Sequence, residues 1–341
     1  MKGATSMNVL HEEHDNGIKE YTLTNNNGMT VKAINIGCSI TEILVPDNKG
    51  DFSNVVLRYD TLEEYFRNED FLGAVIAPIA GRVRDAEFEI GDESYSFTPN
   101  EGRNLLHSGE LNPYNEIWES SIEEDKIVFQ YKMDKRFPGD PLIKVMYSLN
   151  DENELKLEYE ISAESKSIVA PTNHTYFNLS NVLEGDAGGH LVRSNTRSFL
   201  KVDEDLLPES VAVCEGVFDL KHGRLLKDVF ESDDGQVGIA GGGFDHYFIF
   251  EKDEKEVEIT EKGSGRTLKV TTTSPGMVLY TGNNLDGHVV LKDRKAQKHA
   301  GFCMETQESP AALKLPLDQD MRVEEEETYK RETVFRFGVE K

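Results

Sequence analysis

The segment ELKLEYEIS, residues 154–162, decides the fold. Apolar residues at Leu155, Leu157, Tyr159 and Ile161 alternate with charged ones along the segment. Because successive side chains of a β-strand point to opposite faces, this pattern predicts a strand with one face in the core and the other in solvent. Strands of this kind are typical of antiparallel sheets.

The same alternation recurs along the chain. KIVFQYKM (126–133) repeats it, and EFEIGDESYSF (87–97) contains two short alternating runs around a Gly-Asp pair, which indicates a hairpin. EVEITEKGSGRTLKV (256–270) predicts a second hairpin that turns at residues 262–265. We expect TVFRFGV (333–339) to be the closing strand.

Helical patterns are few. TLEEYFRNEDFL (61–72) begins with Thr61 and has Glu64 three residues later, which matches a capping box and predicts one short helix. No linker rich in Gly, Ser or Pro and no repeat of fixed period divides the chain. Many short strands without regular β–α alternation favour an all-β fold, a large antiparallel β-sandwich with few short helices. We expect a single domain over residues 1–341.

Composition excludes several classes of function. The chain has 341 residues, of which 38% are hydrophobic and 17 are Phe, enough for a sizeable core. Its 37 basic and 63 acidic residues give a formal net charge of −26. That field repels phosphate backbones and anionic lipids, and we find no basic patch to overcome it. We therefore expect no nucleic-acid and no membrane partner.

Motifs for common cofactors are missing from the sequence. There is no G-x-G-x-x-G unit between a strand and a helix, no phosphate-binding P-loop and no G-x-S-x-G elbow. The nine histidines show no H-x-x-x-H pair, so we expect neither a cofactor nor a metal site. The three cysteines are far apart, and no leader or membrane-spanning run is visible. Reduced thiols in a cytoplasmic protein are the expectation.

Five stretches carry chemically capable side chains in apolar surroundings. They are APIAGRVRDAEF with Arg82, GRNLLHSG with His107, TNHTYFNL with His174, GGFDHYFIF with Asp245 and His246, and GFCMETQESP with Glu305. A carboxylate that follows an apolar run is partly desolvated, which raises its pKa toward the range of a general base.

Each of these residues also has a purely structural interpretation when it is read alone. Arg82 suits a surface ion pair, His107 a turn cap, and His174 a satisfied histidine of a sheet core. His246 is better explained by a structural role beside its neighbouring aspartate, and Glu305 suits pairing with a lysine. No single stretch decides between structure and function.

The order of the motifs is more specific than any one of them. PIAGRV, NLLHSG, PTNHTYFNL, GFDHYFIF, PGMVLYTGNNLDG and GFCMETQESP follow one another as in the aldose 1-epimerase, or galactose mutarotase, family, which the chain resembles. FPGD (137–140) adds a supporting match. The resemblance extends from about IGCSITEILVPDNKG (36–50) to the last strand.

The resemblance implies a β-supersandwich without cofactor that interconverts the α and β anomers of free hexoses such as galactose and glucose. By motif, Glu305 resembles the general base, His174 the general acid and His107 the second active-site histidine. Arg82 and Asp245 match positions that hold sugar hydroxyls.

Tyr176 shares the motif of His174 and is expected near the sugar. The sequence departs from the family pattern at Gly81, where an asparagine is common, at Val278, where a glutamine is usual, and at Glu308, which follows ETQ. We expect these departures to remove polar contacts around the sugar while the acid and the base are kept.

Two other functions stay open at this point. A phosphosugar 1-epimerase of the same fold would grip its phosphate through Arg82, Arg84 and Arg103. A non-catalytic sugar-binding protein is the second alternative. The preferred sugar and the choice between a monomer and a homodimer are not readable from the sequence.

Overall fold

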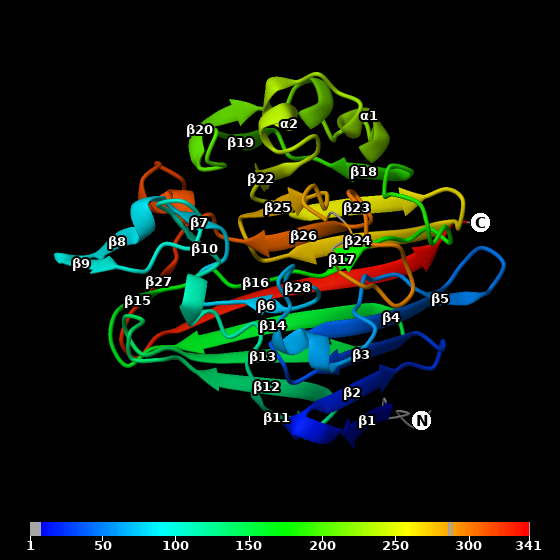
Figure 1. Cartoon of the computed structure of the whole chain (residues 1–341), viewed down its shortest axis with the longest axis horizontal. Coiled ribbons are helices and arrows are strands. Elements are labelled where there is room, and N and C mark those ends of the chain that lie inside the picture. Colours follow the sequence, from blue (N-terminus) through cyan, green and yellow to red (C-terminus); the bar gives the residue numbers. More distant parts are fainter. Residues whose placement is uncertain (1–7, 286, 288, 341) are drawn as a thin grey trace.

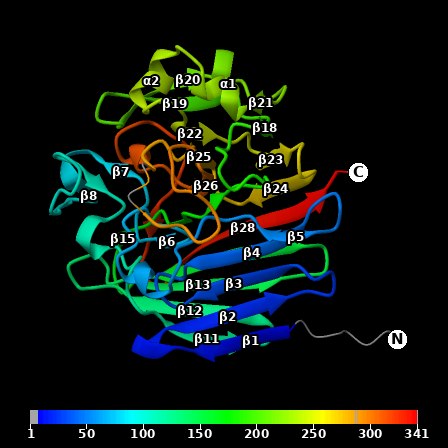
Figure 2. The same ribbon diagram turned by 45° about the vertical axis from the view of Figure 1, so that its right-hand side comes forward.

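The computed structural model describes residues 8–285, 287 and 289–340. The fold is all-β, as predicted, and every ladder between its described named strands is antiparallel. Figure 1 shows the strands stacked across the molecule, and Figure 2 shows β1–β5 lying over β11–β14. The described part of the predicted single domain confirms the large antiparallel sandwich; residues 1–7 and 341 lie outside the described residues.

A nine-stranded sheet forms the main layer. Its strands, in spatial order, are β11 (Glu119–Glu123), β12 (Lys126–Lys132), β13 (Leu142–Leu149), β14 (Glu154–Ser162), β28 (Thr328–Val339), β24 (Arg266–Thr272), β23 (Glu256–Glu261), β18 (His190–Ser194) and β21 (Arg224–Leu225).

Two further sheets pack on this layer. The six-stranded sheet has the order β17 (Tyr176–Phe177), β26 (Phe302–Gln307), β25 (Gly276–Tyr280), β22 (Asp245–Ile249), β19 (Ser198–Val202) and β20 (Pro208–Val213). The five-stranded sheet runs in chain order through β1 (Asn8–Glu13), β2 (Lys19–Thr24), β3 (Thr30–Ile34), β4 (Ile40–Pro46) and β5 (Phe52–Asn54).

Short elements complete the described fold. Two-stranded ladders pair β6 (Val75–Ile76) with β16 (Thr172–Asn173), β7 (Arg82–Val83) with β10 (Leu105–Leu106), β8 (Glu87–Ile90) with β9 (Glu93–Ser96), and β15 (Ser167–Ile168) with β27 (Arg322–Val323). The helices are α1 (Leu226–Phe230) and α2 (Gly235–Ile239), and 3₁₀ turns span Asp15–Gly17, Glu63–Phe66, Arg84–Ala86, Gly109–Leu111, Gly216–Phe218 and Pro310–Leu313.

The alternating segments fold as predicted. The stretch 154–162 is β14, and its apolar residues are buried while their neighbours are partly exposed. The two predicted hairpins are β8–β9 and β23–β24, and Ile259 pairs with Leu268 in the second. The closing segment is the end of β28, which begins earlier, at Thr328.

The predicted helix over 61–72 is wrong. Only the 3₁₀ turn Glu63–Phe66 forms, although the side chain of Glu64 does accept a hydrogen bond from the backbone N–H of Thr61 at 2.9 Å. The turn ends because Asn68 takes a positive φ and its side chain accepts a hydrogen bond from the N–H of Leu72. An asparagine that bonds to nearby backbone competes with helical hydrogen bonds in this way.

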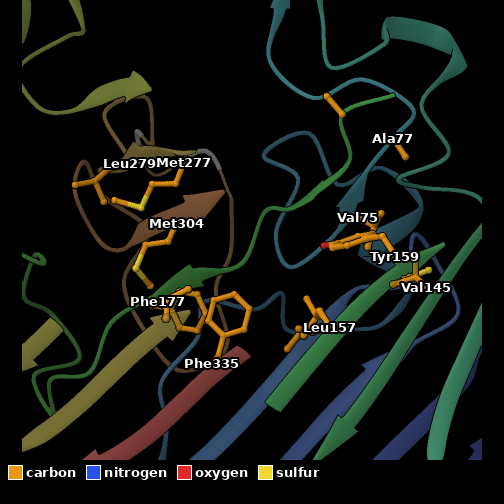
Figure 3. Close-up of a cluster of buried hydrophobic side chains, with 14 of the residues drawn as sticks. Val75, Ala77, Val145, Leu157, Tyr159, Phe177, Met277, Leu279, Met304 and Phe335 are labelled. Atoms are coloured by element: carbon orange, nitrogen blue, oxygen red, sulfur yellow. The ribbon is translucent and has the colours of Figure 1, made fainter. Parts of the chain in front are cut away.

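The core lies between the layers. Phe177 of β17 stacks near Phe335 of β28, and Tyr21 of β2 meets Phe129 of β12 edge to face. Figure 3 shows Met304 of β26 beside the side chains of the six-stranded sheet that face this core. The opposite face of β26 is therefore free to carry polar groups.

The three cysteines are free thiols, as expected. Among the described residues, none of the helices has the length and apolar character that a bilayer crossing requires.

Candidate active site

All six residues proposed as the site line one pocket. The pocket has about 720 Å³ of empty space. Its walls are Glu69, Asp70, Phe71, Gly81, Arg82, Leu106, His107, His174, Tyr176, Asp245, Val278, Tyr280, Asn284 and Glu305. The structure thus brings together side chains that are separated by more than two hundred residues in the sequence.

The alternation of β26 places Glu305. Met304 is buried in the main core, so Cys303 and Glu305, its neighbours on either side, point to the opposite face. Figure 3 shows Met304 together with Met277 and Leu279 of the adjacent β25 on the core side. The register pairs Val278 with Glu305, so the pocket face continues across both strands.

His174 lies between the short strands β16 and β17. Its backbone N–H donates to the carbonyl of Ala74 at 2.8 Å, and its own carbonyl accepts from Gly73. The imidazole Nε2 is 3.6 Å from Oε1 of Glu305, and both side chains are about 95% buried. The acid and the base predicted from remote motifs therefore face each other directly.

His107 follows β10 with a positive φ of 51°. The N–H of Gly81 donates to its Nδ1 at 3.0 Å, and the N–H of His107 donates to the carbonyl of Gly81 at 2.9 Å. Because Nδ1 is an acceptor, the proton of the neutral ring is on Nε2. The ring stands perpendicular to that of His174, with centroids 5.6 Å apart.

Phe71 forms an apolar wall that the sequence reasoning missed. Its ring contacts His107 at 5.0 Å and His174 at 5.7 Å between centroids. Phe71 has a φ of 58°, a conformation that is strained for a bulky residue and that tends to mark functional sites. Because the segment was expected to be helical, no sequence signal pointed to this wall.

Arg82 and Asp245 form the polar end of the pocket. Arg82 Nη1 lies 3.5 Å from Asp245 Oδ2. Glu101 binds the same guanidinium through two hydrogen bonds of 2.6 and 2.8 Å, so both edges of Arg82 are fixed. Glu101 lies close to the LLHSG motif, but its exposed loop gave no reason to select it.

The charges of the pocket shift the pKa values of the central pair in opposite directions. Burial raises the pKa of Glu305 well above its ordinary value; the charge of Asp245 adds to this and that of Arg82 opposes it. Burial lowers the pKa of His174 to about 4. The pair therefore holds one proton over a wide pH range, either on the carboxyl or on the imidazole.

Burial also lowers the pKa of His107 well below its ordinary value, and the charges of His174 and Arg82 act in the same direction. His107 is accordingly a neutral ring with its N–H directed away from Gly81. It is suited to donate a hydrogen bond rather than to transfer a proton.

The donor atoms of His107, His174 and Glu305 lie within 4.8 Å of one another, which is close enough for a metal ion. The hydrogen bond from Gly81 argues against this use. A neutral imidazole that ligates through Nε2 carries its proton on Nδ1, where it would meet the N–H of Gly81. The donor set does not suit a metal ion, and the expected absence of a metal site remains a prediction.

Two of the three departures from the family pattern line the pocket, namely Gly81 and Val278. Gly81 has a φ of 84°, a region that glycine and asparagine tolerate best. Glu308 does not line the pocket: it is fully buried and binds Arg331 and Tyr329. The expectation that this departure removes a sugar contact is therefore wrong for Glu308. Asp286, in the fifth motif, lies outside the described residues.

The remaining candidates have structural roles. His246 is fully buried among aromatic rings, including Phe218 at 4.9 Å, which agrees with the structural interpretation. Arg84 pairs with Asp203, and Arg103 with Asp85. Neither arginine lines the pocket, so the phosphate grip of the alternative function is not assembled.

Comparison with known proteins identifies the family. The family model "Aldose 1-epimerase" matches residues 19–336. The galactose mutarotase of Bos taurus is 33% identical over 91% of this chain and 92% of its own length. The crystal structure of galactose 1-epimerase from Lactobacillus acidophilus superposes with a TM-score of 0.85 at 26% identity, over 99% of this chain and all of that one. A homologue from C. elegans has a TM-score of 0.86 at 22% identity and shows the same fold.

The chain belongs to the aldose 1-epimerase family. It is an isomerase that acts on carbohydrates, and the resemblance inferred from its six motifs is confirmed.

Proposed function

We propose that the protein is a mutarotase, which interconverts the α and β anomers of free hexoses such as galactose and glucose, with Glu305 and His174 as its proton-transferring pair. The supporting observation is the 3.6 Å approach of Glu305 Oε1 to His174 Nε2 within one pocket. The mutarotase relatives and the family model support the same reaction.

The reaction opens and closes a pyranose ring. The carboxylate of Glu305 takes the proton of the C1 hydroxyl, and its O–H electron pair forms the carbonyl as the C1–O5 bond breaks. His174 gives its Nε2 proton to O5. Rotation about C1–C2 presents the other face of the aldehyde, and closure reverses both transfers. Acid–base catalysis of this kind contributes about 10²–10⁴-fold.

This cycle moves one proton between the two partners of the pair. Before ring opening the proton is on His174, and after ring opening Glu305 carries the proton taken from C1. The opposed pKa shifts of the pair bring these two forms closer in free energy than they would be in water. Both steps therefore proceed without exchange with solvent.

The other predicted residues hold the sugar. His107 donates its Nε2–H to the oxygen on which charge develops, a role of the oxyanion-hole type. Arg82 and Asp245 bind ring hydroxyls, and Tyr176, 5.0 Å from His174 between ring centroids, borders the sugar. Orientation of the ring by these contacts supplies a further part of the rate.

Polarimetry of fresh α-galactose and α-glucose with the purified protein tests this function. Mutarotation should be accelerated for both, and glucose 6-phosphate should be a poor substrate, because Arg84 and Arg103 are paired elsewhere. A rate no faster than that of the sugar alone would indicate a binding protein. The free thiols suit a reducing compartment, so we also propose a cytoplasmic location.

A further inference from the structure

Cys303 lies on the pocket face of β26, two residues before Glu305, and is fully buried. Its sulfur is 3.5 Å from Nδ1 of His174. The other nitrogen of the ring faces Glu305. One strand therefore contacts the imidazole at both of its nitrogen atoms, with a thiol at one and a carboxyl at the other.

We propose that Cys303 is a positioning residue whose sulfur accepts the Nδ1–H of His174 and keeps Nε2 directed at Glu305 and the sugar. This inference rests on the proposed role of His174 as the acid. In both one-proton forms of the pair, Nδ1 carries a hydrogen and Nε2 exchanges one with its partner. Sulfur is a weak hydrogen-bond acceptor, so it orients the ring without strongly stabilising the imidazolium.

A thiol suits this position better than the carboxylate that often binds the second nitrogen of a catalytic histidine. A carboxylate would raise the pKa of His174 and make it a weaker acid. Burial raises the pKa of the Cys303 thiol well above its ordinary value, and the charges of Glu305 and Asp245 add to this. The sulfur thus stays uncharged, and His174 remains acidic enough to protonate an ether oxygen.

The two histidines of the pocket then have opposite tautomers. His107 accepts at Nδ1 from Gly81 and has its proton on Nε2, whereas neutral His174 has its proton on Nδ1. His107 is a fixed donor, and His174 can both give and take a proton at Nε2. The titratable or aromatic groups that face the ring of His174 are Cys303 and Glu305 of β26, Tyr176 of β17, Tyr280 of β25, His107 after β10 and Phe71.

Nitrogen NMR of ¹⁵N-histidine-labelled protein tests the tautomers directly. At pH 7 we expect the long-range couplings of the His174 ring to show a protonated Nδ1, and those of His107 to show a protonated Nε2. His174→Gln and His107→Gln assign the signals. A His174 ring protonated on Nε2 alone would overturn the proposal. This readout does not depend on activity, so it separates failure of the proposal from failure of the proposed function.

Substitution of the thiol gives the kinetic test. Cys303→Ala should lower kcat about ten-fold with KM changed less than two-fold, because the ring is no longer held at Nδ1. Cys303→Ser should keep kcat within about three-fold and move the acidic limb of the pH–rate profile upward, since a hydroxyl is a stronger acceptor. Cys214→Ser, at a partly buried thiol outside the pocket, is the matched control and should match the wild type.

An alanine variant with wild-type kcat and an unmoved pH profile in the serine variant would contradict the positioning role. Circular dichroism and the melting temperature show whether each variant is folded. If the alanine variant is not folded, the NMR tautomer and the serine profile still decide the question.

Discussion

Glu305 and Glu308 are buried carboxyl groups three residues apart, at the end of the same strand and just beyond it, yet the structure treats them differently. Glu308 is bound by the guanidinium of Arg331 and the hydroxyl of Tyr329. Glu305 has no cation in direct contact among the described residues and faces a neutral imidazole across the pocket.

A buried charge that is fully paired contributes to structure, whereas one left without a counter-ion has a shifted pKa and becomes available for chemistry. Glu305 has the raised pKa that this contrast predicts. The difference between the two sites can be tested by changing each carboxyl in turn and measuring both activity and stability.

The largest effect is expected from Glu305→Gln. The amide keeps the shape of the side chain but cannot take a proton, so kcat should fall by about 10²–10⁴-fold. Sugar binding should be largely intact, because Arg82 and Asp245 are unchanged. Polarimetry measures the rate and calorimetric titration the binding. A variant within a few-fold of the wild-type rate would disprove the role of Glu305 as the base.

Glu308→Gln should have the reverse effect. It removes the charge opposite Arg331 and leaves a buried guanidinium without its counter-ion, which costs about 3–5 kcal/mol of the free energy of unfolding. Urea denaturation followed by fluorescence measures this loss, and kcat at 25 °C should stay within about three-fold. If kcat falls as far as in Glu305→Gln, the two carboxyls are not functionally distinct.

The pH–rate profile should be bell-shaped and unusually broad. Below the pKa of His174, which is about 4, both partners are protonated and no base is present. Above the raised pKa of Glu305, the pair has lost its proton and no acid is present. Beyond each limb the rate should fall about ten-fold per pH unit. Stopped-flow polarimetry from pH 3.5 to 9 would record it, and an acidic limb near the ordinary pKa of histidine would contradict the assignment.

The sequence predicted the part of this contrast that depends on strand alternation. The pattern of ELKLEYEIS specified β14, and the same rule places Glu305 opposite the core-facing Met304. The motif order identified all six residues that meet in the pocket.

The remaining walls of the pocket could not be predicted, because they depend on backbone that breaks local patterns. Phe71 reaches the histidines only because Asn68 ends a helical turn after one hydrogen bond too few for an α-helix, and alternation does not describe such loops. Glu101 was missed for a similar reason, since a carboxylate in a loop has no pattern until its arginine is located. The pairing of Glu308 likewise needed the register of β28, which lies far away in the sequence.

The smallest effect is expected where the pocket departs from the family pattern. Val278 pairs with Glu305 across the β25–β26 ladder and lines the pocket without offering a polar group. Val278→Gln adds a hydrogen bond to a ring hydroxyl, worth about 0.5–1.5 kcal/mol, so KM should fall by about two- to ten-fold while kcat changes little. Comparing galactose with glucose shows which hydroxyl is contacted, because the two sugars differ only in the orientation at C4. An unchanged KM for both sugars would mean that Val278 does not touch the substrate, and the low polarity of this wall would then belong to the packing of β25 rather than to sugar recognition.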